Sequence, residues 1–280
     1  VQTCALPICY NTPDAGTNKV HGAALGAEKV AEARDAYGWE YDPFEYPAEV
    51  YDRFNQYVEE KKAAHDEWVK LFEKYGQEYP AEYAQLTTNT LDVTDFVDEY
   101  QTGDQIATRV ASSDVLQQLA KANPQFWGGA ADLASSNKTA LKDDGNFTPD
   151  NYAGRNVYYG VREFGAATAT NGINLHGGSR AYVSTFMVFS DYLKAAIRLA
   201  AIQHLPSIFI FTHDSLAVGE DGPTHEPIEQ LAMLRTIPNV QVFRPADAHE
   251  TVEAWKVIAK TTDKPSVLIA SRQKLPDRKS

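Results

Sequence analysis

Residues 212–227 gather the side chains best suited to chemistry: Thr-His-Asp-Ser-Leu-Ala-Val-Gly-Glu-Asp-Gly-Pro-Thr-His-Glu-Pro. Two histidines, His213 and His225, flank a Gly-Glu-Asp-Gly-Pro turn. The preceding run 206–211, Pro-Ser-Ile-Phe-Ile-Phe, is apolar and typical of a strand buried in a parallel sheet. The stretch is therefore expected to be a loop at a strand's carboxyl end, where open α/β sheets bind ligands. Solvated charges and gap-filling histidines are the alternative, but two histidines around one turn favour an active-site loop.

Alternating strands and helices are expected to position this loop. The expected strands are 125–133, 157–160, 181–186, 207–211, 240–243 and 266–270. The expected helices are 109–122, 161–174, 191–203, 227–235 and 248–260. Short connections in this alternating order predict an α/β fold with a doubly wound, mostly parallel sheet and helices on both faces. The polar and aromatic region before it, with expected helices at 27–37 and 47–75, is predicted to be a helical linker.

Two further groups of residues stand beside expected strands. Glu163 lies between a strand and a small-residue helix. Burial there would raise the pKa of its carboxyl group or require a partner, whereas an ion pair with Arg162 or the helix dipole would leave it ordinary. Phe186, Phe189 and Tyr192 form an aromatic cluster that is either core packing or a wall for a flat heteroaromatic ring.

Composition narrows the classes of ligand. The net charge is −12 and the pI is about 5.0, which disfavours nonspecific attraction to nucleic acid or an anionic membrane. No apolar stretch approaches the roughly 20 residues of a membrane span. There is no phosphate-loop, Rossmann or zincin motif. Local arginines would have to hold any anionic substrate, and Arg109, Arg162 and Arg272 are candidates.

The cysteines indicate the compartment. Cys4 and Cys9 lie in the first nine residues, so no disulfide framework is expected in the body of the chain, and a cytoplasmic location is predicted. Residues 1–12 have neither an initiator methionine nor a signal-peptide pattern, and we expect them to be a non-native leader.

Several motifs together resemble the transketolase family. They include His213-Asp214-Ser215, residues 219–225 (Gly-Glu-Asp-Gly-Pro-Thr-His), residues 161–165 (Val-Arg-Glu-Phe-Gly) and Ser271-Arg272-Gln273. Further matches are Gly128-Gly129, Ala131-Asp132-Leu133, Thr185-Phe186, Arg244-Pro245-Ala246-Asp247, Gly16-Thr17, His21-Gly22-Ala23 and Leu25-Gly26. The resemblance extends from about residue 14 to residue 276 with consistent spacing.

This resemblance implies the cofactor thiamine diphosphate, bound between the first domain of one subunit and the pyrimidine-binding domain of the other in a homodimer. Glu163 matches the glutamate that hydrogen-bonds the aminopyrimidine and favours its imino tautomer, so that the exocyclic nitrogen can deprotonate the thiazolium carbon. Phe186, Phe189 and Tyr192 match the pyrimidine pocket. A Mg²⁺ or Ca²⁺ ion is implied as well, with its ligands in the first domain and none among the residues named here.

The resemblance also implies sugar phosphate substrates. His225 and His21 match histidines near the reacting hydroxyl and carbonyl groups, and Asp221 matches the acid that binds a sugar hydroxyl. The matches to the phosphate-binding group are Arg109, Ser136, His213 and Arg272. Charge-assisted contacts from two arginines explain how an acidic chain can bind a phosphosugar. Transfer of a two-carbon ketol unit from a ketose phosphate to an aldose phosphate, in the pentose phosphate pathway, is therefore expected.

Departures from the family pattern predict part of a longer enzyme. The usual Gly-Gly-Ser-Ala-Asp-Leu has Ala130 in place of serine, and Ser135 replaces a proline. The Gly-Asp-Gly…Asn element of the diphosphate and metal site is absent. We expect residues 13–86 to be the end of the diphosphate-binding domain plus a linker, and residues 87–280 to be the pyrimidine-binding domain, without the C-terminal domain.

Two other functions stay open at this point. The chain alone is expected to be inactive, and it could be a noncatalytic cofactor-binding or assembly module. A related dihydroxyacetone synthase or deoxyxylulose phosphate synthase is the other alternative. The sequence around His213-Asp214-Ser215 and Gly219-Glu220-Asp221 favours transketolase over the second of these synthases.

Overall fold

The computed structural model describes residues 10–276 and divides into two compact units, Val1–Lys74 and Tyr75–Ser280. Most of the expected leader, including both cysteines, lies outside the described residues. Within those residues, no helix has the length and apolar character needed to cross a membrane.

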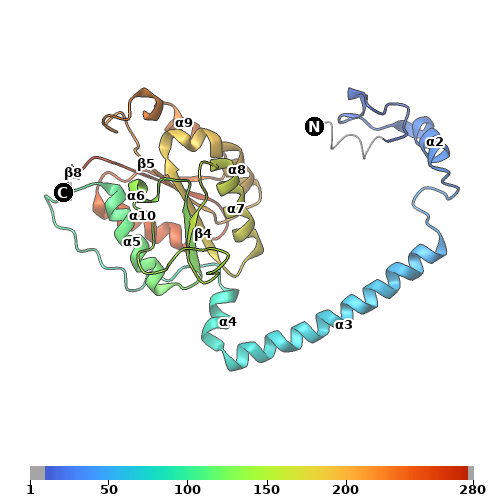
Figure 1. The fold of residues 1–280 in the computed structure, drawn as a ribbon, viewed down its shortest axis with the longest axis horizontal. Coiled ribbons are helices and arrows are strands. Elements are labelled where there is room, and N and C mark those ends of the chain that lie inside the picture. The colour runs from blue at the N-terminus through green and yellow to red at the C-terminus, as the bar shows by residue number, and fades with distance from the viewer. Residues whose placement is uncertain (1–9, 277–280) are drawn as a thin grey trace. The chain divides into compact units, whose positions relative to one another are not determined.

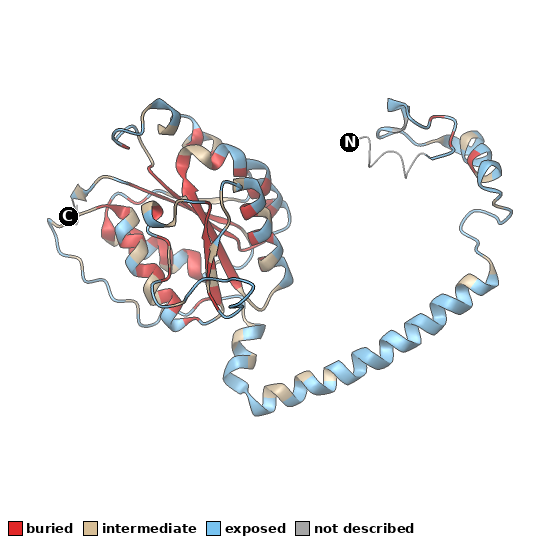
Figure 2. Cartoon of the chain, in the orientation of Figure 1, coloured by how far each residue is buried: buried red, intermediate tan, exposed pale blue. Residues whose placement is uncertain are grey.

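The first unit is built from short elements and the start of one long helix. They are the 3₁₀ turn η1 (Asn18–Val20), α2 (Gly26–Tyr37) and most of α3 (Ala48–Glu78). Gly38 ends α2 in the left-handed conformation at φ 63°, where glycine has no steric cost, and its N–H donates to the carbonyl oxygens of Arg34 and Asp35. No residue of α3 is buried along its 31 residues, as Figure 2 shows. Tertiary packing among the described residues therefore does little to stabilise this helix, which is typical of a segment covered by other parts of a larger protein.

The second unit contains a six-stranded parallel sheet, as predicted (Figure 1). Its strands are β2 (Phe126–Ala130), β3 (Asn156–Tyr158), β4 (Arg180–Phe186), β5 (Ile208–Thr212), β6 (Gln241–Phe243) and β7 (Ser266–Ala270). The spatial order is β3-β2-β4-β5-β7-β6, so the chain leaves β2 first to one side and then to the other. Such a reversal opens a crevice at the carboxyl edge of the sheet.

Helices cover both faces of the sheet. On one face lie α5 (Thr108–Ala122) and α10 (Ala248–Lys260), and on the other lie α7 (Glu163–His176) and α8 (Ser190–Ile202) (Figure 1). Successive residues of β5 serve the two cores in turn: Ile208 and Ile210 face the first, and Phe209 and Phe211 face the second. Since both faces are covered, every residue of β5 is buried.

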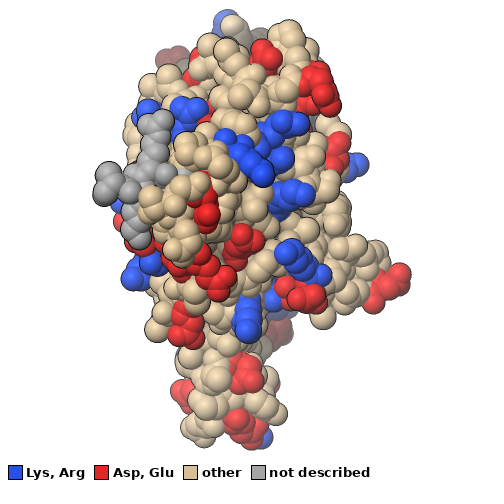
Figure 3. All heavy atoms as spheres, turned by 90° about the vertical axis from the view of Figure 1, so that its left-hand side faces the viewer, with Lys and Arg blue, Asp and Glu red and all other residues tan. Residues whose placement is uncertain are grey.

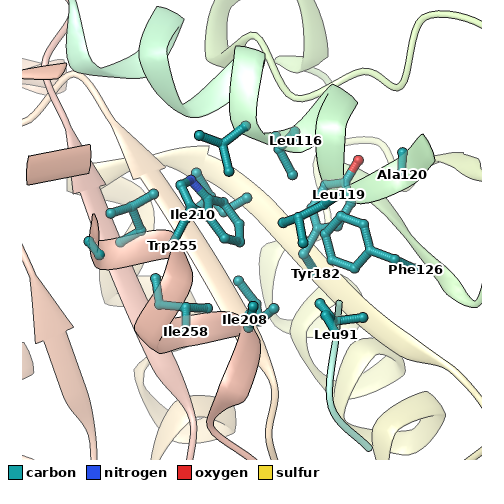
Figure 4. Close-up of a cluster of buried hydrophobic side chains, with 14 of the residues drawn as sticks. Leu91, Leu116, Leu119, Ala120, Phe126, Tyr182, Ile208, Ile210, Trp255 and Ile258 are labelled. Atoms are coloured by element: carbon teal, nitrogen blue, oxygen red, sulfur yellow. The ribbon is translucent and has the colours of Figure 1, made fainter. Parts of the chain in front are cut away.

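The core beneath α5 and α10 centres on Trp255, which is fully buried among aliphatic side chains (Figure 4). Its indole Nε1 donates to Ser112 Oγ at 3.0 Å, so the buried polar atom has a partner. Large aromatic-to-alanine changes at such a position cost about 3–5 kcal/mol, and we therefore regard this cluster as a principal support of the sheet.

The remaining elements refine the expected boundaries. The strand expected at 125–133 ends at Ala130, and the helix expected from Val161 begins at Glu163 because Gly160, at φ 72°, turns the chain first. The helix expected from Pro227 is the shorter α9 (Gln230–Arg235). Three features were not expected: α4 (Pro80–Thr87), the four-residue α6 (Ala134–Asn137), and an antiparallel ribbon of β1 (Gln105–Ile106) with β8 (Leu275–Pro276).

Candidate functional site

The start of α5 is joined to the end of β7 by reciprocal hydrogen bonds. Thr108 N donates to Ser271 Oγ at 3.0 Å, and Ser271 N donates to Thr108 Oγ1 at 2.7 Å. Both side chains are buried. The residues that follow them, Arg109 and Arg272, are thereby held beside each other at the carboxyl edge of the sheet. Burial, and next the charge of Arg272, lower the pKa of Arg109 from its usual value.

A hollow of about 400 Å³ opens at this edge. Its lining residues are Arg109, Ser135, Ser136, Lys138, Phe186, His213, Asp221 and Arg272. We call it the basic hollow, because three cations meet one carboxylate there. All five residues expected to hold the phosphate and a sugar hydroxyl belong to it, whereas Lys138 was not predicted. Guanidinium groups in such a hollow suit a phosphate or carboxylate ligand.

The Arg109 guanidinium has one donor bonded to α6 and another that is buried and unused within residues 10–276. Its Nη1 donates to the carbonyl oxygen of Ser136 at 2.7 Å, which ties α5 to α6. Its buried Nε has no hydrogen-bond partner among the described residues. A buried donor without a partner costs free energy, so this N–H is suited to a ligand that enters the hollow.

Lys138 ends α6 in the left-handed conformation at φ 60°, an uncommon geometry for lysine. Its neighbours Asn137 and Thr139 are both buried and hydrogen-bonded. Since the chain is fixed on both sides, Lys138 is directed by the fold, and its side chain lines the basic hollow.

His213 is the most deeply placed titratable group of the hollow, at 3% exposure. Its ring stacks on Phe186 with centroids 3.7 Å apart, and its Nδ1 lies 2.9 Å from Thr212 Oγ1. Burial, and next the charge of Arg109, lower the pKa of His213 to about 4. The imidazole is therefore neutral near pH 7.

An aromatic cluster adjoins the basic hollow and shares Phe186 with it. Phe186 and Phe189 have nearly parallel rings, with an interplanar angle of 7° and centroids 6.1 Å apart. The edge of His225 contacts Phe189 at a centroid distance of 5.4 Å, and Tyr192 lies 6.3 Å from Phe189. Phe186 is buried whereas Tyr192 is 64% exposed, so the cluster combines core packing with an open wall. A flat ring could pack on such a wall.

Two buried hydroxyl groups lie in the same segment as this cluster. Thr185 Oγ1 and Ser190 Oγ are inaccessible to solvent and have no partner within the described part of the chain. Thr185 is the last residue of β4 before Phe186, and Ser190 begins α8 after the 3₁₀ turn η2 (Met187–Phe189).

The loop after β5 is fixed at its base and at its middle. Arg244 Nε donates to Asp214 Oδ2 at 2.9 Å, which ties the loop to the end of β6. Gly219 adopts φ 94°, a conformation that side chains rarely tolerate, where the loop passes the guanidinium of Arg272. The loop then enters the turn η3 (Pro223–His225), in which His225 Nδ1 lies 2.8 Å from Thr224 Oγ1.

Glu163 and His21 are placed differently from the rest. Glu163 is the first residue of α7 and half-buried, and its carboxylate has no hydrogen bond or ion pair with another described residue, Arg162 included. The expected partner of a buried carboxylate is thus not found among residues 10–276. His21 belongs to the first unit, where it is exposed and ends η1.

The surface charge is unevenly distributed. Figure 3 shows Lys and Arg side chains gathered in the upper half of one face, with Asp and Glu side chains around and below them. A local basic region on a chain of net charge −12 can attract a small anion while the whole molecule repels polyanions. Among the described residues, no group of three or more His, Cys, Asp or Glu could hold a metal ion.

Fold and site together define an α/β protein with a doubly wound parallel sheet and a basic hollow at its carboxyl edge. The sequence model "Transketolase, pyrimidine binding domain" matches residues 104–278, and "Transketolase, thiamine diphosphate binding domain" matches residues 2–93. The chain belongs to the transketolase family. The cofactor expected from the resemblance agrees with these descriptions.

Relatives and solved structures agree with this assignment. Transketolases from Streptococcus pyogenes and Geobacillus stearothermophilus are both 49% identical to the chain over 96% of its length. The crystal structure of a Pichia stipitis transketolase complex with sedoheptulose-7-phosphate has a TM-score of 0.85 and 37% identity over 95% of the chain. The transketolase from Leishmania mexicana has a TM-score of 0.86 and 36% identity over 96%.

The chain spans only part of these relatives. It covers 37% and 42% of the two bacterial sequences, and 41% of each of the two solved chains. A further structure, described as a split gene transketolase in an inactive beta4 tetramer, matches 63% of the chain and 55% of its own length at 30% identity and a TM-score of 0.52.

Proposed function

We propose that the chain forms the pyrimidine-binding part of a transketolase that transfers a two-carbon ketol unit from a ketose phosphate to an aldose phosphate in the pentose phosphate pathway. The observation that carries the proposal is the basic hollow with Arg109, His213, Asp221 and Arg272, which shares Phe186 with the aromatic cluster. A phosphate site next to a ring-binding wall is what this reaction requires.

The residues present fit the pyrimidine half of thiamine diphosphate. Phe189 and Tyr192 offer a partly open aromatic wall, and the Glu163 carboxylate has an unused hydrogen-bonding capacity. Orphaned hydroxyls at Thr185 and Ser190 are consistent with a polar ligand or water nearby. When bound, thiamine diphosphate supplies the carbon nucleophile that breaks and re-forms the substrate's carbon–carbon bond. Its diphosphate, with Mg²⁺ or Ca²⁺, would be held by residues of the first domain.

The role of Glu163 is to bind and orient a ring nitrogen and to hold a proton there. The site is half-shielded from water, and a carboxylate that loses hydration interacts more strongly with a ring N–H. The His225 ring lies next to Phe189, and its Nδ1 is paired with Thr224 Oγ1. Its Nε2 is therefore left to bind a reacting substrate oxygen. His21 would do the same from the first domain.

The basic hollow would bind the phosphate end of the sugar. Arg109 and Arg272 supply charge, Ser136 and His213 supply hydrogen-bonding groups, and Asp221 accepts from a sugar hydroxyl. Binding of the phosphate there would hold the sugar in place and orient its reacting carbons toward the cofactor. This positioning lowers the activation barrier.

We place this function in a cytoplasmic homodimer with the site at the subunit interface. Large apolar side chains are exposed along α7 and α8, and one of them, Tyr192, belongs to the aromatic cluster; the others are Phe164, Leu175 and Ile202. Such a patch is typical of a surface covered by another subunit. Cysteines confined to the first nine residues suit a reducing compartment. No nucleic acid or membrane partner is proposed, in keeping with the acidic net charge.

A noncatalytic assembly module is the second candidate. One comparison favours it: the split gene transketolase chain, which matches 63% of this chain, is described as an inactive tetramer. Oligomerisation of the isolated chain without turnover would agree with it.

Arg272→Ala tests the leading proposal. The substitution belongs in a chimera in which residues 13–276 replace the matching segment of the full-length Bacillus subtilis transketolase, which is 49% identical. We expect KM for phosphorylated sugars to rise about 10-fold or more, since charge-assisted hydrogen bonds contribute about 1.5–3 kcal/mol, while KM for unphosphorylated hydroxypyruvate stays near its starting value. Equal losses with both substrates would count against a phosphate contact.

A further inference from the structure

A continuous series of buried polar side chains connects the interior of the sheet with His213. Asn137 Nδ2 donates to Ser184 Oγ at 3.3 Å, and Thr212 Oγ1 donates to Asn137 Oδ1 at 2.7 Å. Thr212 Oγ1 also lies 2.9 Å from His213 Nδ1. These four residues come from α6, β4 and β5 and the loop after it, and none is more than 3% exposed. We call this series the polar relay.

The lengths of these contacts give the relay a direction. A separation of 2.7 Å is typical of a hydroxyl that donates to a carbonyl oxygen, whereas an amide N–H donor gives longer contacts. Thr212 has a single hydroxyl hydrogen, which is used on Asn137 Oδ1. Toward His213, the same oxygen can then only accept. The hydrogen between Thr212 and His213 must therefore belong to Nδ1.

The other ring nitrogen is the one that serves the basic hollow. With Nδ1 protonated in a neutral imidazole, Nε2 is a bare acceptor. The charged and titratable groups that face the ring are Arg109 from α5, Arg272 from beyond β7, and Asp221 and His225 from the loop after β5. Phe186 covers one face of the ring. Burial, and next the nearby cations, disfavour a positive charge on the ring, which agrees with the lowered pKa of this group.

We propose that the polar relay fixes His213 as the neutral Nδ1–H tautomer, so that its Nε2 binds a phosphate group only together with one proton taken from solution. Asn137 and Thr212 are thus positioning residues, which act through His213. The tautomer follows from the geometry alone, whereas phosphate as the ligand rests on the proposed function.

The proton balance follows from the acceptor character of both atoms. Above the second pKa of a phosphate monoester, near 6, the ligand is mostly a dianion, whose oxygens are acceptors only. Two acceptors cannot form a hydrogen bond, so one proton must be added to Nε2 or to a phosphate oxygen. Each complex consumes one proton, and the affinity should fall up to about tenfold for each unit of rising pH.

Nuclear magnetic resonance of the 280-residue chain with ¹⁵N-labelled histidine tests the tautomer. The His213 signals are assigned by their loss in His213→Gln. We expect a neutral ring with the hydrogen on Nδ1 near pH 7. Added inorganic phosphate should shift its titration upward by roughly one unit or more, as a close opposite charge does. A hydrogen on Nε2 in the free chain would overturn the relay, because Asn137 would then have the opposite amide orientation.

Matched variants separate positioning from general structural support. Asn137→Ala should yield a mixture of tautomers and flatten the pH dependence of phosphate binding. Asn137→Asp keeps an acceptor for Thr212 and should restore the Nδ1–H tautomer. Asn174→Ala, the control, removes a buried asparagine that donates to the carbonyl oxygens of Thr170 and Ala181, and should retain both the tautomer and the slope.

The outcomes distinguish the inference from the function on which it depends. Equal changes in Asn137→Ala and Asn174→Ala would overturn the positioning role. An Nδ1–H tautomer with no response to phosphate at any pH would support the relay but overturn the phosphate site, and with it the proton uptake.

Discussion

At the scale of single residues, the site depends on groups whose own partners are incomplete. Glu163 has a half-buried carboxylate without a partner in the described part of the chain, Arg109 has an unused buried N–H, and His213 has a bare Nε2. Unsatisfied polar groups cost stability in a folded protein. Such groups are expected where a ligand completes the hydrogen bonds. Three of them at one edge of a sheet therefore support a ligand site there.

Glu163→Gln should separate activation of the cofactor from folding. The amide has the same shape but no charge, so the free energy of unfolding should change by less than about 1 kcal/mol, the size of a helix-dipole contribution. In the Bacillus subtilis chimera, turnover should fall at least about 100-fold, because proton transfer by a positioned group contributes that much. Steady-state kinetics and thermal unfolding measure the two effects. Turnover close to that of the parent would rule out the role assigned to Glu163.

Lys138→Met should weaken binding of phosphorylated substrates only. The change removes the charge but keeps most of the length of a side chain that lines the basic hollow. We expect KM for a ketose phosphate to rise about 2- to 5-fold, since an exposed charge contact contributes up to about 1 kcal/mol. Lys142→Met, an exposed lysine that does not line the hollow, is the control. A matching rise of KM with hydroxypyruvate would argue against a contact with the phosphate.

The pH dependence of stability should report on His213. Its pKa is about 4 in the folded chain and near 6.5 in an unfolded one, so the unfolded state binds the proton first as pH falls. The stability that the neutral His213 ring contributes is complete above about pH 6.5 and is lost progressively as the pH falls to about 4. Between pH 7 and pH 5 the loss should be about 1–2 kcal/mol. Urea unfolding of the parent and of His213→Gln measures it as the difference between the two proteins, and an identical pH profile in both would contradict it.

At the scale of elements, the site is assembled from the ends of strands that lie side by side but far apart in sequence. The link between Thr108 and Ser271 joins residues separated by 163 positions. It sets the spacing of Arg109 and Arg272, and the loop after β5 must pass these residues at Gly219. The start of α5, the segment after β7 and the loop after β5 are consequently held in one arrangement. Breaking one of these contacts should displace the residues of the other two segments.

Thr108→Val should test this link. The substitution preserves shape but removes both the hydroxyl donor and the acceptor for Ser271 N, which leaves a buried N–H without a partner. Unfolding should be easier by about 1–3 kcal/mol, and KM for phosphorylated sugars should rise in the chimera. Thr170→Val, also fully buried, removes a bond to the Ala166 carbonyl oxygen within its own helix and a side-chain hydrogen bond with Tyr159, and should leave KM unchanged. Unaltered substrate affinity in Thr108→Val would show that the link does not position the arginines.

Element positions were largely predictable where a local pattern is strong. The run that precedes His213 gave a strand within one residue of β5, because a strand covered on both faces must be apolar throughout. The start of α7 was misjudged by two residues, since Gly160 and Arg162 form a turn that no apolar period records. Four-residue helices such as α6 carry too few residues for a periodic signal.

The composition of the site was predictable to a lesser degree. The resemblance supplied Arg109, Ser136, His213, Asp221 and Arg272, and the fold brings these five together. Lys138 was missed because its direction depends on the buried anchors on either side of it, which are tertiary contacts. The partner of His213 was missed for the same reason: Thr212 is its neighbour in sequence, but Asn137, which orients Thr212, is 75 positions away.

At the scale of the whole molecule, each unit carries apolar surface that its own residues do not cover. No residue of α3 is buried, and aromatic side chains such as Phe54 and Trp68 are exposed on it. Exposed apolar residues on α7 and α8 repeat this pattern in the second unit. Together with the 37% and 42% of relatives that the chain spans, they support the proposal that catalysis requires further protein surface.

The 280-residue chain should therefore bind phosphate but not turn over sugar phosphates. In a coupled assay with thiamine diphosphate and Mg²⁺, we expect no ketol transfer above background, because the groups proposed to hold the diphosphate and the metal are not among its described residues. The chimera with the Bacillus subtilis transketolase should be active under the same conditions, which controls for damage to residues 13–276. An inactive chimera whose unfolding is cooperative would favour the assembly module instead. Turnover by the chain alone would contradict the division of the cofactor site between domains, since one chain would then supply both halves.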